Sequence, residues 1–377
     1  MISMEPVLKR GYSSWDRDVL PEDEYALRVE AVRGVLREQG LAALVVVNYS
    51  LLGVMVDYAD MAYLSGLQSG GALLVPRDAD AVYVGFGGGR ELAFMRTLTW
   101  LEHVMSGGGP KAFEVVREQL RARGITSGPL AIAGAADLPA GAAARVQQAF
   151  ADYTLKPFDA ELRALRAVKR PRELLAMRLT LGLVEDAVYA GLAKFAGGGD
   201  NAAAMLEAER VARARKARDV RVLVNMGGPE LRPFEGRLDG RHAPLRLWVA
   251  AQYQGYWAEA AATTPASLPS AASRAVAAML GAACTGATTG DVAGAAVAAL
   301  APIEAQAALE YGLGGTIGLA HNEGTVMRPG GTERLVEGSA LALRAHVGAG
   351  ADPSIDAAVA TIGASGATRL QPLKIAG

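Results

Sequence analysis

Helix-like and strand-like patterns of hydrophobic residues alternate along the first 160 residues of the chain. Between residues 28 and 39, apolar side chains recur at spacings of three and four, which predicts a helix that ends at Gly40. Residues 41–47 form a continuous apolar run, which is typical of a buried strand. Two more strands are predicted at 71–75 and 81–84, separated by a turn-prone polar segment. The alternation predicts an α/β domain.

The pattern changes after residue 170. Apolar residues spaced by three and four predict a long amphipathic helix that begins at Pro171, because proline favours the first helical turn. Strand-like runs then dominate, with helical segments around them: strands at 221–225, 245–251 and 340–347, and helices at 202–218, 271–283 and 292–301. This order predicts an α+β domain in which helices cover a curved antiparallel sheet. We place the boundary near Asp159, giving domains 1–159 and 160–377.

Composition narrows the classes of function. The 377 residues suit two domains, and 51% of them are hydrophobic, enough for sizeable cores. The formal net charge is -1, with no basic stripe, so no nucleic-acid partner is expected. The single cysteine, Cys284, excludes an intrachain disulfide. No signal peptide or apolar run of about 20 residues is present, so we expect a cytoplasmic protein with no membrane partner.

Four segments in order resemble one family. They are Tyr58 to Gly66, Leu165 to Glu173, Gly255 to Thr263, and Gly314 to Glu323 followed by Leu335 to Gly338. Together they are similar to the creatinase/aminopeptidase P/prolidase family, whose fold is called pita-bread. The resemblance implies a creatinase-type α/β N-terminal domain followed by a pita-bread domain. It also implies a homodimer in which residues near Tyr58 to Tyr63 complete the partner's site.

Five positions decide what the resemblance implies about metal ions. In metal-dependent members of the family, two aspartates, a histidine and two glutamates hold a pair of ions. The matching positions here are Trp248, Glu259, Gly315, Arg344 and Asp356. An arginine is a fixed cation and a tryptophan fills volume, whereas two metal ions need several anionic ligands. We therefore expect no metal and no other cofactor.

The same positions supply candidate catalytic groups. Glu259, expected beside Trp248, is predicted to have a raised pKa suited to general acid/base work. Arg344 is predicted to orient a substrate carboxylate, although an internal Glu259–Arg344 ion pair is the alternative. His321 and His346 are the histidine acid/base candidates. His346 follows Arg344 by two residues, so both should face the same side of a strand.

Further residues are predicted to contact the substrate. Asp356 is a candidate for holding a substrate amine. In creatinases the base lies in a segment that matches residues 225–234, which contain no histidine here. The complete set of predicted substrate-binding residues is Arg344, Asp356, Trp248, Glu323, Arg232 and Phe234.

The sequence therefore predicts a metal-independent, creatinase-like enzyme that hydrolyses a C–N bond in a small amino-acid-like or zwitterionic substrate. A lyase or cyclase on the same scaffold is possible because a fold does not fix the chemistry. The alternative from another class is a catalytically inactive binding protein. Glu259, Arg344 and a histidine around one open pocket would favour chemistry. Closure of Glu259 on Arg344 without free volume would favour binding alone.

Overall fold

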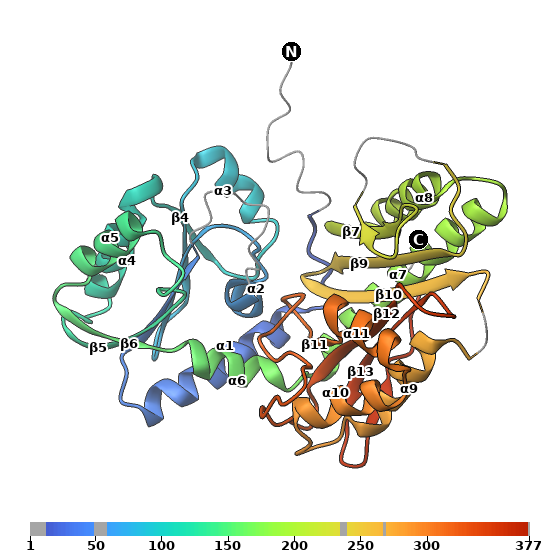
Figure 1. Ribbon diagram of the computed structural model, residues 1–377. Helices are drawn as coiled ribbons and strands as arrows, with labels where there is room; N and C mark the ends of the chain where they lie inside the picture. The colour runs from blue at the N-terminus through green and yellow to red at the C-terminus, as the bar shows by residue number, and fades with distance from the viewer. Residues whose placement is uncertain (1–12, 49–58, 234–239, 267–268, 376–377) are drawn as a thin grey trace. The chain divides into compact units, whose positions relative to one another are not determined.

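The structure is a computed structural model that describes residues 13–48, 59–233, 240–266 and 269–375. The chain divides into two compact units, Ser14–Arg166 and Ala167–Gly377. Within the described ranges, no helix is long and apolar enough to cross a membrane. Each unit is drawn in Figure 1, the first in blue to green and the second in green to red.

The N-terminal unit is built on a six-stranded mixed sheet with the strand order β4-β3-β2-β1-β5-β6. Its strands are β1 (Ala43–Asn48), β2 (Gly71–Pro76), β3 (Val82–Gly85), β4 (His103–Ser106), β5 (Gly128–Ala133) and β6 (Tyr153–Pro157). Its helices are α1 (Glu22–Glu38), α2 (Ala59–Ser65), α3 (Gly89–Met95), α4 (Ala112–Ala122), α5 (Ala140–Ala149) and α6 (Asp159–Ala167). Helices α4 and α5 lie on one side of the sheet, and α1 and α2 lie on the other (Figure 1).

The central strand β1 explains why this sheet is covered on both faces. All of its residues from Ala43 to Val47 are buried, as its continuous apolar run predicts. Val45 and Val47 belong to the core that contains Phe113 and Val116 of α4. The predicted α/β N-terminal domain is therefore confirmed.

The C-terminal unit contains two antiparallel four-stranded sheets, ordered β10-β9-β7-β8 and β11-β12-β13-β14. The strands are β7 (Asp219–Asn225), β8 (Leu231–Arg232), β9 (Leu245–Tyr253), β10 (Tyr256–Thr264), β11 (Gly314–Thr316), β12 (Ala340–Val347), β13 (Ser354–Ile362) and β14 (Ala367–Arg369). The helices are α7 (Pro171–Ala196), α8 (Asn201–Ala214), α9 (Ala271–Ala282), α10 (Thr289–Ala298) and α11 (Pro302–Tyr311). The predicted α+β architecture is confirmed.

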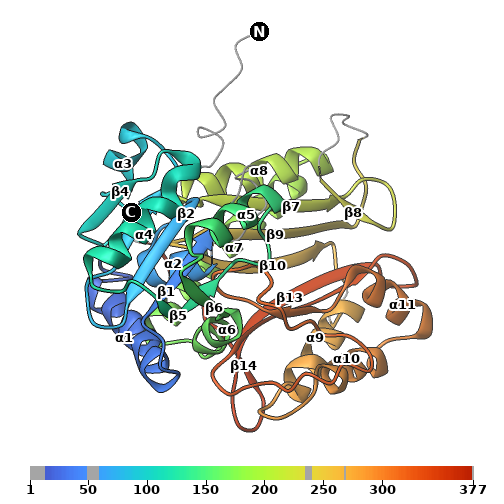
Figure 2. The same cartoon turned by 90° about the vertical axis from the view of Figure 1, so that its left-hand side faces the viewer.

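A tight hairpin fixes the register of β9 and β10. Gln254 and Gly255 both have positive φ angles, 50° and 86°, which matches a two-residue type I′ turn. Glu259 consequently pairs with Ala250, and Trp248 pairs with Ala261. Because side chains alternate along a strand, one face of this sheet carries Trp248 and Glu259. Helices α7 and α8 pack against this sheet, beside β7 and β9 (Figure 2).

The second sheet repeats this division of faces. Leu341, Leu343 and Ala345 of β12 belong to a core shared with α9 and α10, which lie together beside β13 (Figure 2). Arg344 and His346 alternate with them and occupy the opposite face. The two sheets meet at β10 and β13, where Thr263 Oγ1 accepts from the Ile355 amide at 2.8 Å and donates to its carbonyl at 3.3 Å.

Candidate functional site

The carboxylate of Glu259 is the centre of the candidate site. Its residue on β10 has no exposed surface. Arg344 Nη1, from β12, donates to both carboxylate oxygens at 3.1 and 2.8 Å. His321 Nε2 lies 3.0 Å from Oε2. A carboxylate can only accept hydrogen bonds, so Nε2 carries the imidazole hydrogen in this pair.

The pKa of Glu259 is lowered. Burial on its own would raise it, but the charge of Arg344 and the hydrogen bond from His321 outweigh burial. The predicted raised pKa was wrong, because a cation at hydrogen-bonding distance stabilises the ionised form more than apolar neighbours destabilise it. Glu259 is thus an ionised carboxylate rather than a proton donor, and the alternative Glu259–Arg344 ion pair is the one formed.

His321 lies between two indole rings. The ring centroids of Trp248 and Trp257 are 5.7 and 5.4 Å from that of His321, both in edge-on geometry. The residues around His321 are tied to β10 and β11 by backbone hydrogen bonds. Trp257 N donates to Gly318 O at 2.8 Å, and Glu323 N donates to Thr316 O at 2.9 Å. These contacts set the imidazole where it meets Glu259.

Glu323 was predicted to contact substrate, but the structure commits its carboxylate to the protein. Lys169 Nζ donates to Oε2 at 2.6 Å, and Leu319 N donates to Oε1 at 3.1 Å. The two charged side chains are 2% and 5% exposed. A Cβ on Gly318 would lie within 2.9 Å of both, so only glycine leaves room for the pair. Glu323 therefore fixes the loop that carries His321.

Arg344 has donor capacity beyond Glu259. Only Nη1 reaches the carboxylate, and within the described residues no acceptor is found for its Nε or Nη2. Its side chain is 21% exposed, and that of His321 is 14% exposed. A ligand can therefore contact the arginine and the imidazole, but not the buried carboxylate between them.

His346 shares a strand face with Arg344, as predicted, but its contacts are with other residues. Its Nε2 lies 3.2 Å from Arg246 Nη1, and its ring centroid is 4.8 Å from that of Tyr311. Burial and the charge of Arg246 lower the pKa of His346 to about 3. Because Arg246 can only donate, the imidazole accepts at Nε2 and is neutral. In this structure His346 is therefore a neutral hydrogen-bond acceptor, and it is not placed to transfer protons.

Two residues of this neighbourhood were not predicted. Burial raises the pKa of Tyr311, and the nearby charges of Arg344 and Glu259 act on it in opposite directions. Arg246 is two residues before Trp248 on β9, so strand alternation was a signal that could have found it. Tyr311 ends α11 just before the matched segment that begins at Gly314, and no spacing or motif in the sequence singled it out.

The structure does not bring Asp356 to this site. It pairs with Ala345 in the β12–β13 register, so its side chain lies on the face opposite to Arg344. Its carboxylate is 3.6 Å from Arg369 Nη2 and accepts from the Ala357 amide. Burial raises its pKa, and Arg369 partly offsets this. The residue directly opposite Arg344 is Ala357, which has no polar side chain.

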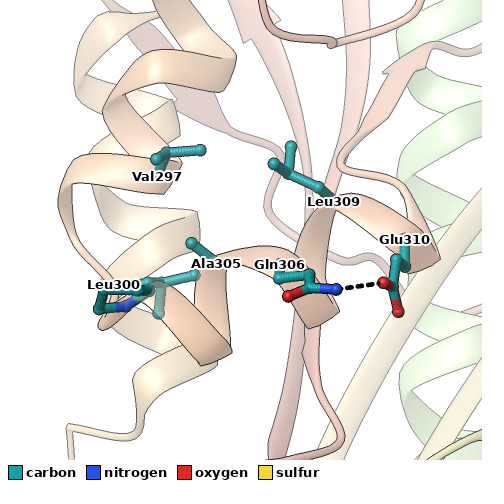
Figure 3. Close-up of a pocket in the computed structure, with 7 residues that line it drawn as sticks. Val297, Leu300, Ala305, Gln306, Leu309 and Glu310 are labelled. Carbon is teal, nitrogen blue, oxygen red and sulfur yellow. Dashed lines mark hydrogen bonds between the residues drawn. The ribbon is translucent and has the colours of Figure 1, made fainter.

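The remaining predicted residues lie elsewhere. Arg232, on β8, is exposed and pairs with Glu230 at 2.6 Å. Phe234 and Tyr58 lie outside the described residues. A hollow of about 590 Å³ between α10 and α11 contains none of the predicted site residues (Figure 3). It is lined by Val297, Leu300, Pro302, Ala305, Gln306, Leu309 and Glu310, and Gln306 donates to Glu310 at 2.9 Å.

The five positions that the resemblance matched to metal ligands do not fit a metal pair here. Glu259 already serves Arg344 and His321, and Asp356 faces away. A Cβ on Gly315 would lie 2.1 Å from the carbonyl oxygen of Thr325, so the backbone here leaves no room for a histidine side chain. Across the described parts of the chain, no group of three or more His, Cys, Asp or Glu residues could hold a metal ion.

Comparisons with known proteins agree with this fold. The Creatinase/Prolidase N-terminal domain family matches residues 28–168. An X-Pro aminopeptidase from Thermotoga maritima MSB8 is similar over 92% of this chain and 97% of its own, with 17% identity and a TM-score of 0.75. The prolidase from Pyrococcus horikoshii OT3 is similar over 92% of this chain and 99% of its own, with 16% identity and a TM-score of 0.72.

A third similar structure is a domain from a subunit of a complex. The N-terminal domain of FACT complex subunit SPT16 from Cicer arietinum (chickpea) is similar over 93% of this chain and 96% of its own, with 14% identity and a TM-score of 0.65. A search of curated proteins gave no significant match. Residues 28–168 thus match the Creatinase/Prolidase N-terminal domain family, and the chain has the fold of X-Pro aminopeptidase and prolidase, which confirms the predicted resemblance.

The neutral state of His346 predicts a pH dependence of stability. Its pKa is about 3 in the folded protein and 6.5 in the reference state, so between these values the unfolded chain binds one more proton. Stability then falls on acidification below pH 6.5, by about 1.4 kcal/mol per pH unit for one proton. In His346→Gln this contribution should vanish, since an amide oxygen accepts from Arg246 without titrating.

Urea unfolding between pH 4.5 and 7.5 measures this difference between wild type and variant. The matched control is His103→Gln, which changes a half-exposed histidine on β4. An unchanged slope in His346→Gln would contradict the assignment of a neutral, buried imidazole.

The buried Lys169–Glu323 pair predicts a large effect on stability. Lys169→Met should lower the free energy of unfolding by about 3–5 kcal/mol, because the buried carboxylate of Glu323 loses the cation that lies 2.6 Å from it. Arg328→Met breaks the exposed pair of Arg328 with Glu333 and should change stability by less than about 1 kcal/mol. Denaturant titration at neutral pH measures both, and equal effects would refute the structural role of Lys169.

Proposed function

We propose that this protein is a metal-independent hydrolase of a C–N bond in a small, amino-acid-like or zwitterionic compound. The observation that carries the proposal is the hydrogen bond between Glu259 and His321 beside the partly exposed Arg344. The donor set supports metal independence, because Arg344 takes the place of an anionic ligand and supplies the charge that offsets Glu259.

Glu259 and His321 form a carboxylate–imidazole pair. With hydrogen on Nε2 toward Glu259, the lone pair of His321 lies on Nδ1, for which the described residues provide no hydrogen-bond donor. An ionised, buried carboxylate holds the imidazole in this tautomer and stabilises the imidazolium that forms when Nδ1 takes a proton. His321 is thus the proposed general base, and Glu259 is the positioning residue.

The proposed reaction is a two-stage proton transfer through His321. Nδ1 takes a proton from water as the water oxygen bonds to the carbon of the C–N bond, whose π electron pair moves onto its double-bonded oxygen or nitrogen and returns when the intermediate collapses. The C–N bond then breaks, its electron pair goes to nitrogen, and the leaving nitrogen receives the proton from Nδ1. A histidine suits both directions of transfer because its ordinary pKa lies near neutrality.

Arg344 is proposed to bind the substrate carboxylate. Its Nη1 is engaged with Glu259, while Nε and Nη2 form an edge that can donate two parallel hydrogen bonds. This placement holds the substrate next to His321, because both side chains converge on the same Glu259 carboxylate. Closure of Glu259 on Arg344 agrees with a protein that only binds, but such a protein has no need for an oriented histidine.

Turnover by His321→Gln tests the proposal. Purified protein is incubated with a panel of N-acyl, N-carbamoyl and guanidino amino acids, and products are measured by mass spectrometry. For any compound that is cleaved, His321→Gln should lower kcat by about 10²–10⁴-fold, with a much smaller change in KM, because the base acts in the chemical step. His103→Gln should retain wild-type kcat.

Metal analysis completes the test. Activity should survive chelation, and elemental analysis should find no tightly bound metal. Two bound metals per chain, with activity lost on chelation, would overturn metal independence. Wild-type kcat in His321→Gln would remove the histidine from the mechanism.

A further inference from the structure

Buried hydrogen-bond donors without a partner cluster on one face of the β9–β10 sheet. Among the described residues, four buried side-chain atoms lack any partner: Arg117 Nε, Arg246 Nε, Trp248 Nε1 and Trp257 Nε1. The last three belong to β9 and β10. Arg246 and Trp248 are two residues apart on β9 and therefore share one face. Trp257 likewise shares its face of β10 with Glu259. The pairing of Trp248 with Ala261 places all of them on the Glu259 side.

Such donors are costly in a folded protein. A buried N–H group without an acceptor loses its hydrogen bonds to water and costs about 1–3 kcal/mol. The chain contains four tryptophans, and the two in the other unit show the usual arrangement. Trp15 Nε1 donates to the Leu20 carbonyl at 2.7 Å, and Trp100 Nε1 donates to the Leu64 carbonyl at 2.9 Å. Among the residues that the structure describes, only the indoles beside His321 have no acceptor.

The protein supplies few acceptors on this face. Both oxygens of Glu259 are engaged by Arg344 and His321. The acceptor nitrogen of His346 faces Arg246. The guanidinium of Arg221 lies 4.3 Å from the centre of the Trp257 ring and 3.9 Å from Asp219, so Arg246 and Arg344 are the cations that face the single carboxylate of Glu259. The site therefore has an excess of donors and of positive charge.

We infer that this site binds a carboxylate compound that also carries an amide or ureide carbonyl, with the indole N–H groups of Trp248 and Trp257 donating to the carbonyl oxygen. The inference rests on the proposed function for the role of Arg344, whose free edge takes the carboxylate. An indole N–H can only donate, so it offers nothing to a guanidinium or an ammonium group at the same place. N-acyl and N-carbamoyl amino acids fit, and guanidino acids do not.

Two isosteric probes separate these classes. N-carbamoylglycine and guanidinoacetate have the same carboxylate and the same chain length. They differ in one position, which is a carbonyl oxygen in the first and a cationic NH₂ group in the second. Each is titrated into full-length protein labelled with ¹⁵N at the indole nitrogens. Four indole signals are expected, assigned with Trp→Phe variants at each tryptophan.

N-carbamoylglycine should shift the indole signals of Trp248 and Trp257 and leave those of Trp15 and Trp100 in place. Guanidinoacetate should bind at least about tenfold more weakly, because it leaves at least one buried indole N–H without an acceptor. Arg344→Met should weaken N-carbamoylglycine binding without moving the Trp100 signal. Equal binding of both probes would overturn the inference, and so would N-carbamoylglycine leaving both site signals unmoved up to its solubility limit.

The same titration separates this inference from the proposed hydrolysis. Indole shifts without turnover of N-carbamoylglycine or other carbonyl compounds would retain the acceptor site and reject the hydrolase. Cleavage of a guanidino acid with no response of Trp248 or Trp257 would retain the hydrolase and reject the acceptor site.

Discussion

The carboxylate of Glu259 joins the parts of the C-terminal unit that form the site. It lies on β10 of one sheet and accepts from Arg344 on β12 of the other, while His321 reaches it from the segment after β11. Since Glu259 has no exposed surface, its charge must be balanced inside the protein, and removing one partner of such a pair leaves an uncompensated buried charge. One ion pair therefore both links the two sheets and sets the tautomer of the histidine.

This arrangement changes what the scaffold can do. In a two-metal site the ions offset several carboxylates, and the chemistry passes through a bound water. Here a single carboxylate is offset by a guanidinium that cannot lose its proton. The backbone carbonyl of Thr325 also occupies the space that a side chain at Gly315 would need. In the proposed mechanism, the chemistry depends on one imidazole and on the Nε–Nη2 edge of one arginine, which suit proton transfer and anion binding.

Most of the fold was predictable from the sequence, because local periodicity and order determine it. The strands near residues 43, 71, 245 and 340 and the helix from Pro171 follow directly from apolar runs and spacing. The site was predictable only in part. Strand alternation correctly placed His346 on the same face as Arg344. It could not show that Arg246, on another strand, would keep that imidazole in its uncharged form.

Two errors at the site have specific physical causes. For Glu259, the apolar neighbours were visible in the sequence, but the distance to Arg344, which reverses the sign of the pKa shift, was not. For Asp356, the matched segment was located correctly, yet the register with Ala345 turns its side chain to the opposite face. A shift of one residue in a strand reverses the face of every side chain, and a sequence match alone does not fix that register.

The unpartnered donors bear on whether the site retains a function. A protein that kept only its fold would gain stability if Trp248 and Trp257 were replaced by aromatic residues without an N–H group, since each unsatisfied donor is a cost. Buried groups that lack a partner in the free protein are expected at ligand-binding sites, because the bound ligand supplies the missing partner. Three such donors on the face that also carries an oriented histidine are costs that packing alone does not explain. The simplest physical account is a ligand whose oxygen atoms complete the site.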